Sequence, residues 1–512
     1  MKNSIYITLI CFLLGATVNA QLFNPQTKEI TETFFPDSDA IVESTPALKK
    51  KRGYTNYKEL VDFINNLKEK HNKKVSITYI GKSQKGKDIP MVKLDLPNGK
   101  EKIKVFMQGG LHGDESASTE TMLYLMDRLL NDTAYSNLLD HVELAIIPMA
   151  NIDGFLKNKR SAANGLDLNR DQTKLIAPES IVLKQAFSDF APHVAIDFHE
   201  YRPYRRDFAR MGKFGVTNAF DAMFLYSGNL NIPKNIRDLT KNLFVDNASA
   251  VLDENNYTNH PYISSRKVFG EIHINQGSIS SRSSATNFAL SNAISSLIEI
   301  RGVALGKASF KRRIHTGFLI AISYLKTASE NMKLVKNEIT KATNQTNDVV
   351  VTYERDVYKN DIKFIDISDV AYVNKEMTIR DAWKAKPILT RPRPKAYIID
   401  ANQTEVIEKL KILGVEMEIL NDSKTFQVNA YKVKSHNKAT YKYEKRNIQV
   451  VETDLVKKEV TFNKGSAIVM MNQKRANIIP EVLEPEATNS FVSFSIIKAK
   501  TESILPIYRL LN

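Results

Sequence analysis

The chain has 512 residues, enough for roughly two or three domains that each bury a hydrophobic core. Hydrophobic residues make up 43% of it and charged residues 25%, as is ordinary for a globular protein. Its 72 Lys and Arg against 57 Asp and Glu give a formal net charge of +15, but the basic residues are spread along the whole length. No segment interleaves basic and aromatic residues as a nucleic-acid surface does, so we expect no nucleic-acid partner.

Residues 1–20 are typical of a secretory signal peptide. Lys2 precedes an apolar core at residues 5–18, and the small-residue ending Val18-Asn19-Ala20 completes the pattern. The core is short for a membrane span, so we expect no span once the signal is removed. Cys11, the one cysteine, lies inside this core, so the mature chain would have no disulfide. These features favour a secreted or periplasmic bacterial protein.

Two patterns precede the main domain. Residues 21–52 are polar, contain prolines and end in a basic run, so we expect an extended lead-in. Residues 57–71 have apolar side chains at helical spacing and predict an amphipathic helix. Residues 75–80 and 89–94 then predict two strands joined by a turn-rich segment.

Strands and helices alternate from there to about residue 340. This alternation predicts an α/β fold with a mixed, largely parallel sheet flanked by helices. The expected strands include 105–107, 142–149, 194–198 and 297–300, and the expected helices include 121–130, 179–190, 288–294 and 310–340.

From about Asn344 the sequence changes to short alternating or apolar runs, interrupted by one helical pattern at residues 404–413. This region contains a single histidine, His436, and no cluster of metal ligands, so we expect it to lie outside any metal chemistry. The predicted organisation is a signal peptide at 1–20, a lead-in at 21–52, an α/β domain at 53–343 and a smaller β-rich domain at 344–512.

A candidate metal-binding pair lies where an expected strand gives way to a helix. His112 and Glu115 stand three residues apart, just after Gly109-Gly110. Zinc binds histidine nitrogen and carboxylate oxygen, and a catalytic zinc site needs only three protein ligands. The pair alone is a weak signal, since His-x-x-Glu often arises by chance and a surface histidine near a glutamate is the ordinary alternative.

Two further residues strengthen this interpretation. His199 directly follows the expected strand at 194–198, and Glu299 lies within the expected strand at 297–300. In α/β sheets, ligands bind at the carboxyl ends of the strands. The shared placement of His112, His199 and Glu299 therefore favours one common site.

In chain order, the segments His112 with Glu115, residues 160–170, His199 and Glu299 resemble the zinc carboxypeptidase family, whose best-known member is carboxypeptidase A. The resemblance covers roughly residues 53–302, and the run Gly-Leu-Asp-Leu-Asn-Arg at 165–170 is its most specific piece. The sequences at 483–486 and 505–509 also look like the β-domain that follows some bacterial members. The resemblance implies a carboxypeptidase-like fold and a zinc-dependent peptide hydrolase.

The resemblance also implies roles for single residues. His112, Glu115 and His199 match the three ligands of one zinc ion per chain, which would leave an open position for a water molecule. Glu299 matches the general base that takes the proton of that water and returns it to the departing amine. The alternative for Glu299 is a structural carboxylate paired with Arg301.

Four residues of the segment at 160–170 match groups that act on the substrate or support the metal site. Arg160 matches the arginine that stabilises the oxyanion. Asn169 and Arg170 match the pair that binds the terminal carboxylate of the substrate. Asp167 is expected to orient His112 by binding the ring nitrogen that does not bind the metal. The alternatives are surface ion pairs for the arginines and a turn residue for Asp167.

The sequence departs from the family pattern at two places. The family carries a tyrosine on a mobile loop before the base, but residues 277–288 contain none. Tyr257 and Tyr262 remain alternatives for this role. Glu200 follows His199 where digestive members have a small residue, which predicts a different pocket wall.

Together these patterns predict a secreted zinc metallocarboxypeptidase that acts on peptides with a free C-terminal carboxylate. The alternative is a zinc-dependent amidase or deacylase acting on cell-wall peptides or N-acyl amino acids. A catalytically inactive binding protein is disfavoured, because every metal and base position is filled.

Overall fold

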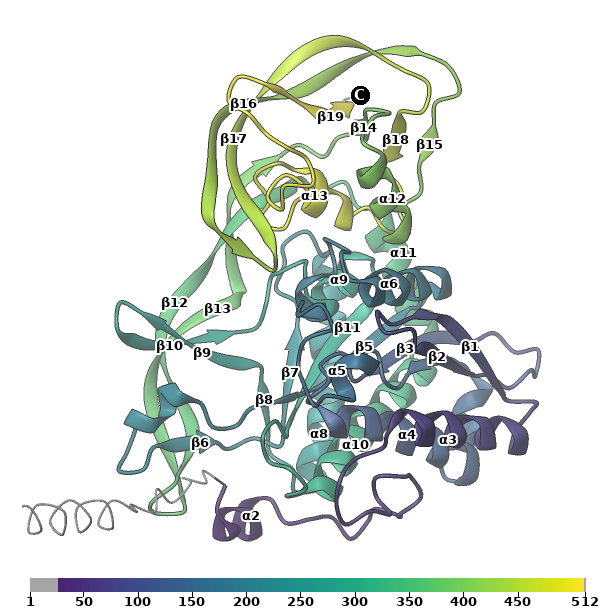
Figure 1. Cartoon of the computed structure of the whole chain (residues 1–512), viewed down its shortest axis with the longest axis vertical. Helices are drawn as coiled ribbons and strands as arrows, with labels where there is room; N and C mark the ends of the chain where they lie inside the picture. Colours follow the sequence, from purple (N-terminus) through teal and green to yellow (C-terminus); the bar gives the residue numbers. More distant parts are fainter. Residues whose placement is uncertain (1–25, 511–512) are drawn as a thin grey trace, which may run out of the picture.

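The computed structural model describes residues 26–510 (Figure 1). The predicted signal peptide at residues 1–20 therefore lies outside the described residues. Within the described part, none of the helices combines the length and the apolar character that crossing a membrane requires.

An eight-stranded sheet forms the centre of the α/β part, in the order β1-β2-β4-β3-β5-β11-β7-β8. Its four central strands β4, β3, β5 and β11 are parallel, whereas β1–β2, β2–β4 and β11–β7 are antiparallel pairs. This confirms the predicted mixed, largely parallel sheet. The strands are β1 (Val75–Lys82), β2 (Asp88–Leu94), β3 (Ile103–Gly109), β4 (Val142–Ile147), β5 (Val194–Tyr201), β7 (Ala222–Tyr226), β8 (Asn259–Pro261) and β11 (Ile294–Arg301).

Helices cover both faces of this sheet, with α6 and α9 on one side and α4, α8 and α10 on the other (Figure 1). Every residue of β5 is buried, as expected for a central strand that is covered on both faces. The helices are α3 (Tyr57–Lys70), α4 (Ser116–Asn131), α6 (Pro178–Phe190), α8 (Asp246–Glu254), α9 (Ser284–Leu290), α10 (Phe310–Glu330) and α11 (Met332–Thr343).

Two predicted helices have different bounds in the structure. The helix expected at 288–294 ends at Leu290, and β11 begins at Ile294, so the sequence pattern had merged the end of a helix with the start of a strand. The helix expected at 310–340 is divided into α10 and α11 at Asn331, whose φ of −112° is not helical.

A second sheet stands beside the first, in the order β6-β12-β13-β10-β9. Its long hairpin, β12 (Val349–Asp366) and β13 (Ala371–Arg391), pairs with β6 (Val216–Asn218) and β10 (Glu271–Gln276), and β9 (Ile263–Val268) lies at its edge. Strands that follow residue 344 therefore complete a sheet begun by strands of the preceding region.

A third sheet has the order β15-β18-β14-β19-β16-β17. Its hairpin of β16 (Lys424–Tyr443) and β17 (Arg446–Phe462) extends from the C-terminal part towards the α/β part (Figure 1). The sequence predicted short strands here, but β16 is one strand of 20 residues. The other elements are β14 (Ala396–Ile399), β15 (Glu418–Ile419), β18 (Ala467–Met470), β19 (Ile504–Leu510), α12 (Thr404–Ile412) and α13 (Ile478–Leu483).

The segment expected to be an extended lead-in is folded onto the α/β part. It contains the helix α2 (Lys28–Phe34), which Thr27 caps through a hydrogen bond from the backbone N–H of Ile30. Further along, the buried Glu120 of α4 accepts hydrogen bonds from the backbone N–H of Ala47 at 2.8 Å and from Thr55 at 2.6 Å. These bonds satisfy a buried carboxylate and fix the path of the segment across the helix.

Candidate active site

The three predicted metal ligands converge at one point beside the ends of the central strands. His112 and Glu115 lie in the turn between β3 and α4, and His199 lies near the end of β5. One donor atom from each of the three lies within 4.8 Å of the others, and all three side chains are buried. Because β3 and β5 are neighbours in the parallel sheet, the chain brings the two histidines together there.

The turn after β3 depends on Gly113. A Cβ atom at this position would lie 2.1 Å from the backbone carbon of Gly154. Only glycine allows the two backbone segments to approach so closely. The chain can thus turn sharply between the strand and the helix, and His112 and Glu115 face the same point.

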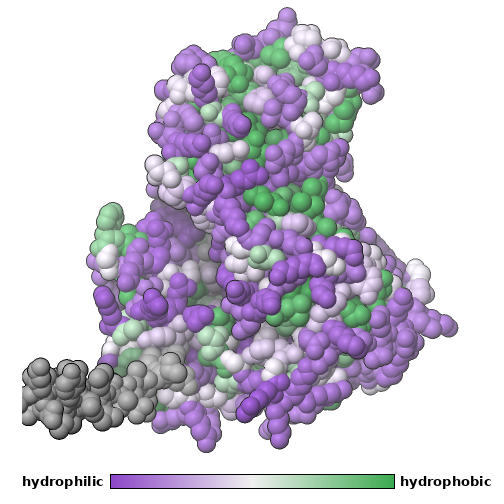
Figure 2. Space-filling model, viewed as in Figure 1, coloured by the Kyte–Doolittle hydropathy of each residue, from purple (hydrophilic) through white to green (hydrophobic). Residues whose placement is uncertain are grey.

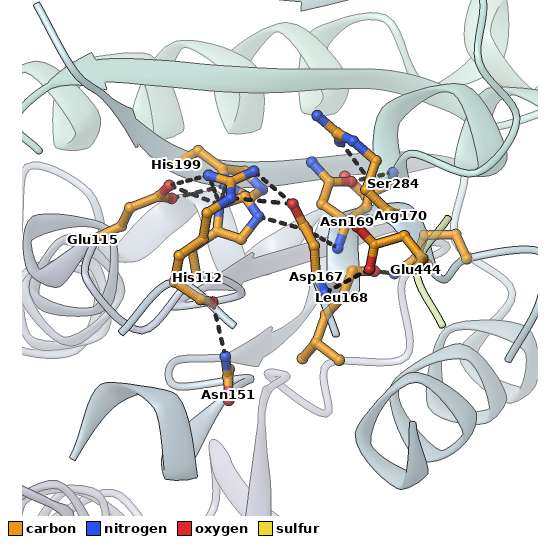
Figure 3. Close-up of polar contacts among 12 residues, drawn as sticks. His112, Glu115, Asn151, Asp167, Leu168, Asn169, Arg170, His199, Ser284 and Glu444 are labelled. Atoms are coloured by element: carbon orange, nitrogen blue, oxygen red, sulfur yellow. Dashed lines mark hydrogen bonds and ion pairs between the residues drawn. The ribbon is translucent and has the colours of Figure 1, made fainter. Parts of the chain in front are cut away.

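The donor atoms face one another at short distances (Figure 3). Nδ1 of His112 and Nδ1 of His199 are 3.0 Å apart. The Glu115 carboxylate lies 2.7 Å from the first nitrogen and 2.8 Å from the second. Two imidazoles and one carboxylate are one of the donor sets found in catalytic zinc sites.

A carboxylate contacts each histidine at Nε2, the ring nitrogen that faces away from the common point. Nε2 of His112 is 3.0 Å from Asp167, and Nε2 of His199 is 2.8 Å from Asp197. Since a carboxylate accepts a hydrogen bond, each Nε2 carries a proton, and the Nδ1 lone pairs point to the common centre. Asp197 was missed in the sequence, although residues two apart in a strand point to the same face and Asp197 stands two before His199.

The electrostatics of this centre fit a bound cation. Although burial opposes protonation of both histidines, the Glu115 carboxylate raises the pKa of His112, and Asp197 and Glu115 raise that of His199. Burial also disfavours the charged form of Glu115, but the two histidines hold the pKa of its carboxyl well below the usual range. A centre that favours positive charge, with two lone pairs and a carboxylate directed at it, fits a divalent metal ion.

Glu299 lies on β11, directly opposite His199 of β5 in the parallel register. Its Oε2 is buried and accepts no hydrogen bond from the described residues. Burial and, after it, the charge of Glu115 raise the pKa of Glu299 to about 7. The alternative partner, Arg301, instead donates a hydrogen bond to Gln26 at 2.7 Å, and no ion pair joins it to Glu299 within the described part of the chain.

Arg160 lies at the solvent side of the donor set, with 44% of its side chain exposed. Its NH2 group donates to Asp167 at 2.8 Å, and its NH1 group lies 3.5 Å from Glu115. Asp167 therefore binds Arg160 and His112 together. Burial would raise the pKa of Asp167, but His112 and Arg160 hold it well below its usual range, so it stays charged.

Asn169 and Arg170 follow Asp167 in one short turn (Figure 3). Gly165, with a φ of +79°, begins this turn in a conformation that favours glycine. Asn169 Oδ1 accepts from the backbone N–H of Ser284 at 2.8 Å, which fixes the amide and leaves its NH₂ group available. Arg170 donates to the carbonyl of Asn169 at 2.8 Å, and both side chains line the cavity described below.

Of the two tyrosines left open by the sequence, Tyr262 lines the cavity with Glu299 and Arg170. The hydroxyl of Tyr257 instead lies 2.7 Å from Nδ1 of His315, away from this cavity. The sequence could not distinguish them, because a contact between distant segments places Tyr262: its backbone N–H donates to the carbonyl of Phe224 on β7 at 2.9 Å.

Glu200, the residue after His199, lines the cavity but has a structural partner. Its carboxylate accepts from Nε of Arg313 on α10 at 2.8 Å and from the backbone N–H of Ala117 at 2.8 Å. Removing one partner of such a buried ion pair typically costs about 3–5 kcal/mol. Glu200 therefore joins β5 to the two helices packed beside it.

The tip of the β16–β17 hairpin contacts the loop that carries Asp167. Glu444 accepts a hydrogen bond from the backbone N–H of Asp167 at 3.1 Å (Figure 3), and the Tyr443 ring lies 4.5 Å from the Arg282 guanidinium. The metal-ligand cluster of the described residues lies outside residues 344–512, as expected, but this hairpin reaches the loop that orients His112. Asp167 and Glu444 are 277 residues apart, and no local pattern signals such a contact.

A cavity of about 930 Å³ opens beside these residues, between the main sheet and the sheet of β9, β10 and β12. Figure 2 shows a hollow between these two parts of the molecule, with hydrophilic side chains along it. His112, Arg160, Asn169, Arg170 and Glu299 all line it, so a substrate in the cavity can reach these five side chains.

Residues 60–195 match the sequence family described as zinc carboxypeptidase. Over 441 residues the chain is 31% identical to "Carboxypeptidase 2" of Trichophyton rubrum, and the alignment covers 84% of this chain and 81% of that protein. The chain belongs to the zinc carboxypeptidase family. "Carboxypeptidase 2" of Trichophyton equinum is 30% identical with the same coverage. As a member of this family the chain is a metallocarboxypeptidase, an enzyme that hydrolyses peptides.

Among solved structures, the carboxypeptidase A of Helicoverpa armigera aligns with a TM-score of 0.43 and 19% identity. The alignment covers 56% of this chain and 78% of that one.

The contact between Asp197 and His199 leads to a first prediction. Asp197→Asn keeps the size of the side chain but removes the charge that orients His199 and strengthens its Nδ1 as a ligand. Zinc affinity, measured by competition with a chelator, should fall by about 10- to 100-fold. Asp189→Asn, an exposed site on α6, serves as the matched control and should leave the affinity unchanged. Equal affinities in the two variants would contradict the role of Asp197.

Proposed function

We propose that the chain is a secreted zinc metallocarboxypeptidase that removes residues from the free C-terminus of peptides. His112, Glu115 and His199 hold one zinc ion per chain, and Glu299 is the general base. The observation that supports this proposal most strongly is the buried, unbonded carboxylate oxygen of Glu299 on the strand next to His199. It is an available proton acceptor beside the only donor cluster of this kind among the described residues.

When bound, the zinc ion supplies a Lewis acid that polarises the scissile carbonyl and lowers the pKa of a water molecule. Glu299 accepts the proton of the attacking water on a carboxylate oxygen and returns it to the departing amine nitrogen. A carboxyl group whose pKa is raised towards neutrality can both take up and release a proton at working pH.

Arg160 and the Asn169–Arg170 pair act on the substrate. The guanidinium of Arg160 stabilises negative charge that develops on the carbonyl oxygen, and Asp167 keeps it in place. Arg170 binds the terminal carboxylate with two parallel hydrogen bonds, and the Asn169 amide donates a third. Tyr262, which lies in the same cavity, is our candidate for the role of the mobile-loop tyrosine of the family.

We also propose the division into a signal peptide at 1–20, a lead-in at 21–52, a catalytic domain at 53–343 and a β-rich domain at 344–512. The predicted signal peptide supports export. The change to short alternating or apolar runs from about Asn344 supports the last boundary. The β-rich domain also has a structural role at the catalytic domain, because Glu444 at the hairpin tip accepts a hydrogen bond from the loop of Asp167 and helps to hold that loop in place.

The role of Glu299 leads to a second prediction. Glu299→Gln keeps the shape of the side chain but cannot accept a proton, so kcat should fall by at least ~10²-fold while zinc content stays unchanged. Glu254→Gln, at an exposed site on α8, is the matched control and should keep full activity. Near-normal turnover by a zinc-loaded Glu299→Gln variant would require a different base.

The third prediction tests the substrate class. Two peptides of the same sequence, one with a free C-terminal carboxylate and one with an amide, are compared by kcat/KM. The wild type should strongly prefer the free acid. Arg170→Lys cannot form the two parallel hydrogen bonds, so this preference should decrease on the order of 10- to 100-fold.

The same pair of peptides distinguishes the alternative activity. An amidase or deacylase that ignores the terminus would hydrolyse both peptides equally, and Arg170→Lys would then leave the ratio unchanged. That result would contradict the carboxypeptidase proposal and favour the amidase.

A further inference from the structure

Arginine is strongly over-represented in the wall of the cavity. Seven arginines line it, against four carboxylates, and no lysine of the described residues does. Arg160 and Arg170 already have places in the proposed mechanism. The others are Arg202, Arg205 and Arg206 after β5, Arg282 before α9, and Arg355 on β12.

These five guanidinium groups have no ion-pair partner among the described residues. Arg313 outside the cavity shows the usual arrangement, since its NH2 group lies 2.5 Å from the carboxylate of Glu200. The Nε of Arg282 is buried without any hydrogen bond, and burial lowers the pKa of Arg282 and that of Arg355. The cavity therefore contains positive charge that its own side chains leave uncompensated.

Two of the five are held in place by neutral groups. Arg205 donates through NH2 to the carbonyl of Ser265 on β9, and Arg355 donates through NH1 to Oδ1 of Asn275 on β10 at 3.2 Å. Ser265 and Asn275 themselves line the cavity. Each guanidinium group is thus positioned by one neutral hydrogen bond, while its remaining N–H groups stay available to a ligand.

One substrate carboxylate cannot compensate this charge. A terminal carboxylate takes one bidentate arginine, and Arg170 fills that role in the proposed mechanism. Positive groups inside a concave, partly buried site attract anions more strongly than the same groups on an open surface. The planar guanidinium fork matches a second carboxylate better than any neutral or cationic side chain.

We propose that the cavity selects peptides with acidic side chains at the C-terminal end, in the last residue or the one before it. Arg205 and Arg355 bind the carboxylate of that Asp or Glu side chain. This substrate preference rests on the proposed carboxypeptidase activity. Peptides that end in lysine or arginine are the poorest substrates, because they bring like charge into the cavity.

The experiment compares free-acid peptides that differ only by Glu or Gln, in one series at the last residue and in another at the preceding one. These side chains have nearly the same size, so the ratio of their kcat/KM values reports the charge. The wild type should prefer Glu by about 10-fold or more in at least one series. Added salt should reduce the preference, as expected for an electrostatic contribution.

Variants then identify the residues responsible. Arg205→Gln and Arg355→Gln should each lower the Glu/Gln ratio towards 1, mainly through KM, whereas Arg205→Lys and Arg355→Lys should keep part of it. Arg52→Gln removes the same charge at an exposed site before α3 and should leave the ratio unchanged. Zinc content confirms that each variant keeps the metal site.

The outcomes separate this inference from the proposed function. Efficient hydrolysis of free-acid peptides with a wild-type Glu/Gln ratio of 1 or below in both series would overturn the acidic preference and leave the carboxypeptidase proposal intact. A wild-type preference that both glutamine variants retain would overturn the assignment to Arg205 and Arg355. Failure to hydrolyse any free-acid peptide would instead contradict the proposed function.

Discussion

The lone pairs of two histidines and the charge of Glu115 are directed at a single point, and the surrounding structure depends on this arrangement. Three electron-rich groups so close together repel one another unless a cation lies between them. Asp167 and Asp197 fix the two rings from behind, and Gly113 lets the turn approach closely enough to place His112 and Glu115. The parallel pairing of β3, β5 and β11 then adds Glu299 to the same edge of the sheet.

Most of this centre could be predicted because its signals are local. His112 and Glu115 are three residues apart, and the stretch from Arg160 to Arg170 is short enough to be recognised as a unit. The central strands could be predicted for the same reason, since buried parallel strands are continuous apolar runs. Asp197 was within reach too, because the alternation of side chains along β5 places it on the face of His199.

The rest could not be predicted, because it depends on contacts between distant segments. The Glu444 contact with Asp167 is formed by a hairpin whose length no short pattern revealed. Arg205 and Arg355 are 150 positions apart by their numbering and line the same cavity because β12 lies in one sheet with β9 and β10. Polar contacts also join the parts: Lys409 of α12 donates to the carbonyl of Lys174 at 2.6 Å. The β-rich region thus contributes Arg355 to the cavity wall and is joined to the α/β part by polar contacts.

The central claim is that one zinc ion is held by three side chains of this chain. The direct measurement is zinc content by elemental mass spectrometry after loading and dialysis, in the wild type and in His112→Ala and His199→Ala. One zinc per chain is expected in the wild type, and almost none in either variant, with the fold checked by circular dichroism. A full equivalent of zinc in both folded variants, or none in the loaded wild type, would contradict the account.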